Sequence, residues 1–188
     1  MASSVRIYRD GPLSVRPPEE IRYGVGECVL GAVLVACSEE GIVSIIVGEK
    51  AGPMLRELRE RFPKARLESD DVGVPLRQVV AFIAKPAGRF PLALDLRGTI
   101  FQQRVWREVQ KVPFGQTSTY SRIAEAIGAP KAIRAVASSC TRCWWSFAVP
   151  CHRVLHKGGA EAAMADPQGR RRYRWLAYES GLMAKGRD

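Results

Sequence analysis

Residues 150–153 read Pro-Cys-His-Arg and follow directly on the apolar run WWSFAV at residues 144–149. A thiol is a nucleophile only as the thiolate, so a catalytic cysteine needs a neighbouring base or positive charge. Cys151 has both beside it, and His152 is one of only two histidines in the chain. The stretch therefore predicts a nucleophilic cysteine with a histidine base. The alternative is that Cys151 is a small apolar side chain of the core, because free cysteines are often buried.

The composition is typical of a folded protein in a reducing compartment. Of the 188 residues, 46% are hydrophobic and 26% are charged, which is an ordinary globular balance. No apolar stretch approaches the ~20 residues of a membrane span, and the first residues lack the apolar segment of a secretory signal. An odd number of scattered cysteines argues against a disulfide framework. We therefore expect a cytoplasmic protein with no membrane partner.

The positive charge is concentrated in the second half of the chain. Residues 1–100 hold 14 Lys and Arg against 13 Asp and Glu, whereas residues 101–188 hold 15 against 6. A basic half beside a nearly neutral one indicates a polyanionic partner, with nucleic acid as the first candidate. A basic, well-solvated surface without such a partner is the alternative.

The first half predicts a small α+β domain over residues 21–92, after a flexible lead-in at residues 1–20. The expected antiparallel sheet has about three strands, from apolar runs at residues 28–30, 32–36 and 42–47. Apolar residues at helical spacing predict helices at residues 54–62 and 74–84. The sequence shows no phosphate-binding loop or pair of carboxylates there, so we expect a structural role.

The second half, residues 96–185, predicts a mainly helical domain. Thr99 can cap a helix that ends before the turn at residues 112–115. Further on, Ser118 and Thr119 precede a short helix, residues 128–130 form a turn, and a second helix starts at Lys131, which is a helix-turn-helix pattern. Many helical hairpins share this pattern without binding DNA. Here, however, small residues alternate with basic ones at the start of the second helix, which allows close approach to a groove.

Ordered motifs in this chain resemble the O6-alkylguanine-DNA alkyltransferases, most closely the alkyltransferase half of bacterial Ada proteins. The motifs are RGT at residues 97–99, FQQ at 101–103, VW at 105–106, TY at 119–120, KAIRAVA at 131–137 and PCHRV at 150–154. The similarity extends back to residues 21–31 and 40–42, so the resemblance covers roughly residues 21–182. Because no four-cysteine cluster precedes this region, we do not expect the zinc-binding, transcription-activating half of Ada.

The resemblance implies an α+β fold with a ribonuclease-H-like antiparallel sheet and helices at the amino end. A helical, winged-helix-like domain with a helix-turn-helix follows. It also implies a monomeric DNA repair protein that enters the minor groove of double-stranded DNA and flips the alkylated guanine into a pocket. The alkyl group then moves to Cys151 in one irreversible turnover. O6-alkylguanine is the implied substrate, and O4-alkylthymine is a further candidate. No cofactor and no metal are implied, and the implied location is the bacterial cytoplasm, on the nucleoid when bound to DNA.

The resemblance also assigns roles to individual residues. Cys151 is the alkyl acceptor, His152 removes its proton through a water, and Glu179, preferred over Glu161, orients the imidazole. The expected substrate pocket comprises Tyr120, Cys143, Val154, Met164 and Ala165. The expected DNA-binding residues are Thr119, Tyr120, Ser121, Ala132, Arg134, Ala135 and Ser138, with Arg134 replacing the flipped base.

Several positions depart from the family pattern. Cys143 stands where the family usually has an asparagine that ties the recognition helix to the active-site loop, and two tryptophans follow it. Met164 and Ala165 replace the usual tyrosine and serine of the loop after the nucleophile. These changes leave a lesion-binding protein with weak or no transfer as an alternative. The spacing Cys140-x-x-Cys143 leaves a helix-turn-helix regulator with a metal or redox pair as another, less favoured because there is no second pair.

Overall fold

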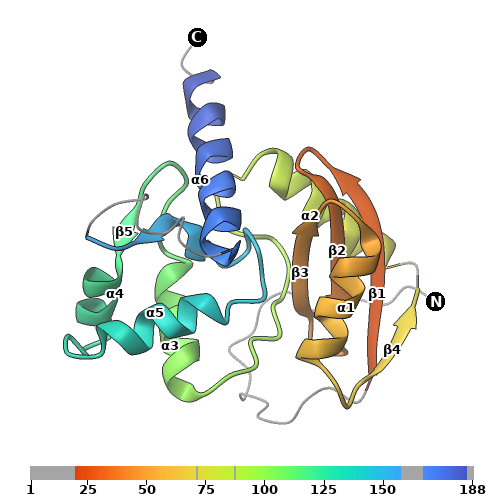
Figure 1. The fold of residues 1–188 in the computed structure, drawn as a ribbon, viewed down its shortest axis with the longest axis horizontal. Helices are drawn as coiled ribbons and strands as arrows, with labels where there is room; N and C mark the ends of the chain where they lie inside the picture. Colours follow the sequence, from red (N-terminus) through yellow and green to blue (C-terminus); the bar gives the residue numbers. More distant parts are fainter. Residues whose placement is uncertain (1–19, 71, 87, 158–166, 186–188) are drawn as a thin grey trace. The chain divides into compact units, whose positions relative to one another are not determined.

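The computed structural model describes residues 20–70, 72–86, 88–157 and 167–185, and these form two compact units (Figure 1). The first, the sheet unit, comprises the described residues up to Lys85, Arg89–Thr99 and Trp144–Ser146. The second, the helical unit, comprises the remaining described residues, chiefly Ile100–Cys143 and those from Phe147 onward. The fold is α+β, as the sequence predicts.

The sheet unit contains a four-stranded mixed sheet in the order β3-β2-β1-β4. Its strands are β1 (Glu20–Cys28), β2 (Gly31–Cys37), β3 (Ile42–Gly48) and β4 (Arg66–Ser69). β1 pairs antiparallel with β2, and β2 with β3, whereas β4 runs parallel to β1. The structure thus corrects the expected antiparallel sheet of about three strands by adding a fourth, parallel strand.

Two local features explain this difference. β4 has the sequence RLES, whose single apolar residue gives no alternating signal. The apolar run at residues 28–30, expected as a strand, instead lies at the hairpin between β1 and β2, where Cys28 pairs with Gly31. β1 itself has the sequence EIRYGVGEC, in which glycines and charged residues hide the strand.

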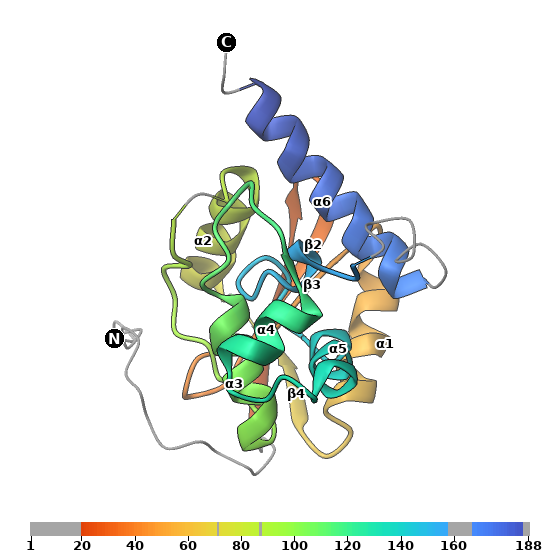
Figure 2. The same ribbon diagram turned by 90° about the vertical axis from the view of Figure 1, so that its left-hand side faces the viewer.

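Helices α1 (Ala51–Arg61) and α2 (Gly73–Ala84) cover opposite faces of this sheet (Figures 1 and 2). On the α2 face Gly24 leaves room for the helix, since a Cβ there would lie 2.7 Å from a methyl group of Val72. Because both faces are covered, six consecutive residues of β3 are buried. The core on the α1 face comprises Ile21, Leu34, Ala36, Val43, Ile46, Met54, Leu58 and Phe62.

The residues Trp144–Ser146 belong to the sheet unit although they come late in the sequence. The backbone N–H of Ile45 in β3 donates to the carbonyl of Trp144 at 2.8 Å. The indole N–H of Trp145 donates to the carbonyl of Ile42 at 2.7 Å, and this side chain is fully buried. The two tryptophans that depart from the family pattern are therefore anchored to the edge of the sheet.

The helical unit is built from α3 (Ile100–Val109), α4 (Tyr120–Ala126), α5 (Ile133–Thr141) and α6 (Pro167–Lys185). It also contains the 3₁₀ turn η1 (Cys151–Arg153) and a parallel pair of short strands, β5 (Ser118–Thr119) and β6 (Val154–Leu155). Trp106 of α3 is buried, and its indole N–H donates to the carbonyl of Ser139 in α5 at 2.9 Å. This bond ties α3 to α5. None of the helices in the described ranges is long and apolar enough to cross a membrane.

The segment from α4 to α5 has two helices joined by a tight turn. The hydroxyl of Thr119 caps α4 by accepting from the backbone N–H of Arg122 at 3.2 Å. Gly128 takes a left-handed conformation with φ +69°, which favours glycine. Beneath the turn Ala124 is fully buried, and its carbonyl accepts from the N–H of Ala129 at 2.9 Å. α5 begins at Ile133 rather than at Lys131, because the residues between form a further turn.

Candidate active site

A tight backbone turn places Cys151 inside the helical unit. The N–H of Cys151 donates to the carbonyl of Val149 at 2.7 Å, and η1 then follows. Phe147 enters this turn with φ 65°, a left-handed conformation that costs an aromatic residue roughly 1–2 kcal/mol. Its ring packs against the rings of His152 and Trp175, at centroid distances of 5.1 and 5.3 Å. The turn leaves Cys151 only 5% exposed.

Beside Cys151 a buried charged network joins η1 to α6. The Nε2 atom of His152 lies 2.9 Å from Oε1 of Glu179. The guanidinium of Arg153 donates to both carboxylate oxygens of Glu179 at 2.8 Å and to the carbonyl of Val112 at 2.8 Å. All three charged or polar side chains are at most 5% exposed. The carboxylate of Glu179 is thus held by two donors from adjacent residues of one turn.

The surroundings fix the charge of this network. Burial alone would raise the pKa of Glu179, but hydrogen bonds from His152 and Arg153 outweigh burial and hold that pKa below its ordinary value. For His152 burial is the largest influence and lowers the pKa, although the Glu179 carboxylate opposes it. At neutral pH we therefore assign an ionised Glu179 and a neutral His152.

The tautomer of His152 follows from its partner. An ionised carboxylate only accepts hydrogen bonds, so Nε2 carries the proton and Nδ1 carries the lone pair. Nδ1 is buried, and no group of the described residues forms a hydrogen bond with it. His152 therefore presents a proton-accepting nitrogen in the same turn as Cys151.

The Cys151 thiol is itself protonated at rest. Burial raises its pKa well above the ordinary value, and the neighbouring thiols of Cys140 and Cys143 raise it further. Cys143 is half-buried, and its Sγ donates to the carbonyl of Val149 at 3.6 Å. This contact ties the end of α5 to the active-site turn, where the family pattern has an asparagine. Any nucleophilic use of Cys151 thus requires a base.

Tyr120 and Arg172 complete the surroundings of the thiol. Arg172 of α6 donates to the hydroxyl of Tyr120 at 3.4 Å and to the carbonyl of Cys140 at 2.7 Å. Tyr120 is 8% exposed, and burial raises its pKa despite the opposing charge of Arg172. Its phenol is therefore a protonated hydrogen-bond donor at neutral pH.

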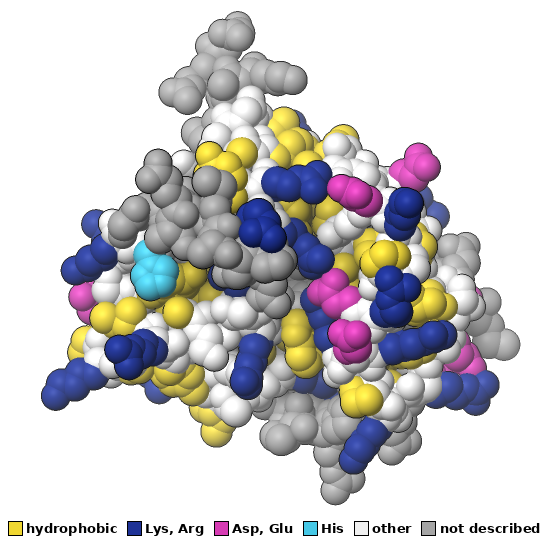
Figure 3. Space-filling model, viewed as in Figure 1, with side chains coloured by type: hydrophobic (Ala, Val, Ile, Leu, Met, Phe, Trp, Pro, Cys, Tyr) yellow, Lys and Arg dark blue, Asp and Glu magenta, His cyan; other side chains and the backbone are white. Residues whose placement is uncertain are grey.

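The residues expected to bind DNA lie on α4 and α5 or directly before these helices. Arg134, Ala135 and Ser138 are exposed on α5, and Ala132 is half-buried just before it. Lys and Arg side chains are spread over the molecular face that also shows an exposed histidine (Figure 3). α5 therefore presents small residues and an arginine to solvent, as a groove-binding helix requires.

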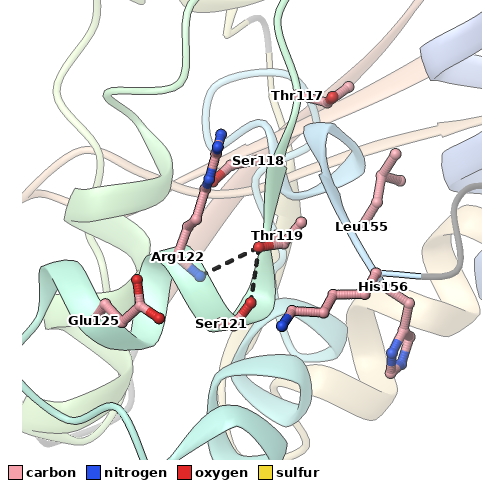
Figure 4. Close-up of a pocket in the computed structure, with 9 residues that line it drawn as sticks. Thr117, Ser118, Thr119, Ser121, Arg122, Glu125, Leu155 and His156 are labelled. Atoms are coloured by element: carbon pink, nitrogen blue, oxygen red, sulfur yellow. Dashed lines mark hydrogen bonds between the residues drawn. The ribbon is translucent and has the colours of Figure 1, made fainter.

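An open hollow of about 520 Å³ lies where β5, α4 and β6 meet (Figure 4). Thr119 and Ser121, two expected DNA-binding residues, line it, and their hydroxyls are 3.0 Å apart. Arg122 and Lys157 add positive charge to the same hollow, and Glu125 adds one carboxylate. The hollow thus brings together hydroxyls and cations, which are groups that bind phosphate.

The structure brings together most of the expected site residues. Cys151, His152, Glu179, Tyr120 and Cys143 surround one turn, and Val154 is buried directly after it. Met164, Ala165 and Glu161 lie outside the described residues. Sequence reasoning missed Arg153 and Arg172 as site residues. Their signals were the position of Arg153 inside the motif and the spacing of seven residues between Arg172 and Glu179.

In the parts of the chain that the structure describes, no group of three or more His, Cys, Asp or Glu side chains could hold a metal ion. Cys140 and Cys143 therefore do not form such a site with their described neighbours. All five cysteines are present as thiols.

The chain is similar to known proteins over most of its length. Residues 100–181 match the family described as 6-O-methylguanine DNA methyltransferase, DNA binding domain. The bifunctional transcriptional activator/DNA repair enzyme Ada of Escherichia coli (strain K12) is 40% identical over 141 residues, which are 74% of this chain and 40% of that protein. This chain thus spans less than half the length of that relative.

Two further relatives match over most of their own length. The constitutive methylated-DNA–protein-cysteine methyltransferase of Bacillus subtilis (strain 168) is 31% identical over 138 residues, 73% of this chain and 82% of that protein. The crystal structure of Mycobacterium tuberculosis OGT in complex with DNA has a TM-score of 0.67 at 28% identity. It covers 85% of this chain and 93% of that chain.

Proposed function

The chain belongs to the methylated-DNA–protein-cysteine methyltransferases, and from this premise we propose that it repairs DNA by moving an alkyl group to itself. The donor is O6-alkylguanine in double-stranded DNA, and the acceptor is Sγ of Cys151. The reaction consumes the acceptor, so each molecule acts once. The same geometry admits O4-alkylthymine as a second donor.

The observation that carries this proposal is the state of His152. Its Nε2 is engaged by the buried carboxylate of Glu179 at 2.9 Å, so Nδ1 is left as a proton acceptor on the residue that follows Cys151. A neutral imidazole with a fixed tautomer is the base that a protonated, buried thiol needs. The ionised Glu179 then stabilises the imidazolium that forms.

The proposed reaction proceeds by displacement. His152 takes the thiol proton through a water, and the sulfur attacks the alkyl carbon in line with the departing O6 oxygen. A sulfur–carbon bond forms, the carbon–oxygen bond breaks, and the guanine oxygen leaves with the electron pair. A proton then returns to the guanine, so the products are an unmodified guanine and a thioether on Cys151. Because a thioether does not revert to a thiol, the turnover is single and needs no cofactor.

Tyr120 is proposed to act on the departing guanine. Its phenol stays protonated at neutral pH, so it can donate to the base while negative charge develops there. Arg172 positions this phenol through its contact at 3.4 Å and is itself anchored on the carbonyl of Cys140. Cys143 and Val154 are proposed to line the pocket with Tyr120.

Binding to the minor groove is proposed for α5. Arg134 lies on its exposed side and would fill the space left by the flipped base, while Ala132, Ala135 and Ser138 allow close approach. Thr119 and Ser121 would bind the backbone phosphates. One copy of the chain contains every proposed group, so we propose a monomer. With DNA as its substrate, its proposed location is the bacterial cytoplasm.

The test is intact-protein mass spectrometry after mixing with a duplex that holds one O6-methylguanine. We expect the mass to rise by one methyl group in place of a hydrogen, located on Cys151 by peptide analysis. The Cys151→Ala variant should gain nothing, whereas Cys37→Ala, a matched change in the sheet unit, should gain the methyl like the wild type. Unchanged wild-type mass with lesion-selective DNA binding intact would contradict transfer and support the lesion-binding alternative.

A further inference from the structure

Cys143 and Cys151 both donate a hydrogen bond to the same backbone oxygen. The carbonyl of Val149 accepts from the N–H of Cys151 at 2.7 Å and from Sγ of Cys143 at 3.6 Å. The thiols of Cys143 and Cys140 are also close enough to the Cys151 thiol to raise its pKa. Three sulfur atoms from one stretch of twelve residues thus gather at the acceptor.

The three thiols differ in their access to solvent. Cys140 and Cys151 are buried, at 1% and 5% exposed, whereas Cys143, two residues after the end of α5, is half-buried. An oxidant dissolved in water therefore meets Cys143 first. Once oxidised, Cys143 already has a second thiol beside it, which is the arrangement of a reactive cysteine with a resolving partner.

We propose that Cys143 and Cys151 form a modification site for hydroperoxides, at which they are joined by a reversible disulfide. The hydroperoxide transfers one oxygen to the sulfur of Cys143, giving a sulfenic acid and an alcohol, or water when the oxidant is hydrogen peroxide. The sulfur of Cys151 then attacks that of Cys143, so a sulfur–sulfur bond forms, the sulfur–oxygen bond breaks and water leaves. Two thiols lose two electrons and two hydrogens, and the hydroperoxide is reduced.

The disulfide has a consequence for repair that rests on the proposed function. While it exists, Cys151 has no thiol to accept an alkyl group. A dithiol reductant restores both thiols by exchange, whereas the thioether left by alkyl transfer is permanent. Under oxidising conditions the disulfide therefore holds Cys151 in a form that a reductant can convert back to the thiol.

The chain offers a direct way to locate the bond. Trypsin cleaves after Arg142 and Arg153, so Cys143 and Cys151 share the peptide of residues 143–153, while Cys140 lies in the peptide of residues 135–142. A Cys143–Cys151 bond leaves the 143–153 peptide as a single species, lighter by about 2 Da. A bond that involves Cys140 joins the two peptides instead.

The experiment treats the full chain with hydrogen peroxide, blocks remaining thiols and digests it with trypsin. We expect the lighter 143–153 peptide from wild type and from Cys28→Ser, the control in the sheet unit, and its loss in Cys143→Ser. In parallel, transfer from a duplex with O6-methylguanine should fall more than about tenfold on oxidation and return with dithiothreitol, each variant being compared with its own untreated sample.

The outcomes separate the two proposals. A Cys140–Cys143 peptide pair with Cys151 still blocked as a thiol would overturn the inference, as would stepwise oxidation of Cys151 that dithiothreitol does not reverse. The peptide mass is measured without DNA, so it reports on the disulfide alone. Absence of transfer from the reduced wild type would instead overturn the proposed function and leave the disulfide result standing.

Discussion

Replacing Glu179 by glutamine tests the buried network that positions His152. The carboxylate accepts two hydrogen bonds from Arg153 and one from His152, all between 2.8 and 2.9 Å. Glutamine keeps one oxygen but turns an N–H₂ group toward a donor, and it leaves the guanidinium of Arg153 charged and 5% exposed. Removing one partner of a buried ion pair costs about 3–5 kcal/mol. We expect a loss of that size in the free energy of unfolding.

The assay is urea unfolding at pH 7 with fluorescence detection. With a slope of ~2 kcal/mol per molar urea, the Glu179→Gln midpoint should fall by ~2 M. Glu60→Gln is the matched control, since Glu60 is exposed on helix α1 and surface changes stay within ~0.5 kcal/mol. At urea-free conditions where the variant is folded, its transfer rate should fall by ~10²-fold, because the imidazolium loses its counter-charge.

Two results would refute this reasoning. If Glu179→Gln and Glu60→Gln unfolded at the same midpoint, the network would contribute no stability. If the variant were destabilised but transferred the methyl group at the wild-type rate, Glu179 would be structural and His152 would not depend on it as a base.

Three further predictions concern the same site. First, stability should fall as the pH drops, because the pKa values of His152 and Glu179 are both lowered on folding and the unfolded chain binds more protons. The His152 contribution is complete above about pH 6.5 and the Glu179 contribution above about pH 4.5, and unfolding curves across this range should show that Glu179→Gln lacks the lower step. Second, Arg172→Met should lower the transfer rate by ~10-fold through the lost charge-assisted bonds to Tyr120 and Cys140, with duplex binding unchanged in a filter assay and Arg171→Met as the control. Third, Arg134→Ala should slow transfer from duplex DNA by at least ~10-fold but slow it less from single strands, where no base has to leave a stack; equal losses on both would contradict a role in base flipping.

Helices α1 to α5 were readable from the sequence because each carries its own local signal. Thr119 caps α4, Gly128 sets the turn, and the apolar face of α3 ends where the helix ends. The sheet was less readable. In β1 two glycines, which make room for α2, interrupt the alternating strand pattern. β4 pairs through its backbone and has almost no apolar side chains. Those features depend on partners elsewhere in the fold, which no local window contains.

The same distinction divides the site. The motif predicted Cys151 and His152, and the family resemblance implied Glu179, which the structure brings to 2.9 Å from the imidazole. The sequence did not predict that Arg153 would share this carboxylate, or that Arg172 would reach Tyr120 and Cys140. Arg153 and Arg172 both have long side chains, and the packing of α6 against η1 determines which groups they contact. A basic residue inside a motif predicts positive charge near the site, but only the fold determines which carboxylate forms the ion pair with it.

The directions of the pKa shifts in this site suit a protein that acts once, as the proposed function requires. A thiol with a lowered pKa would react with any dissolved electrophile, and each such reaction would consume a molecule before it met DNA. Here burial keeps Cys151 protonated, while a neutral His152 and an ionised Glu179 stand ready beside it. Under the proposed function, we expect deprotonation to become favourable when an alkyl carbon lies in line with the sulfur and a donor receives the departing oxygen. On this proposal the substrate complex, and not the resting thiol, supplies the reactivity. Of the three thiols at the site, the half-buried Cys143 is the one more accessible to solvent.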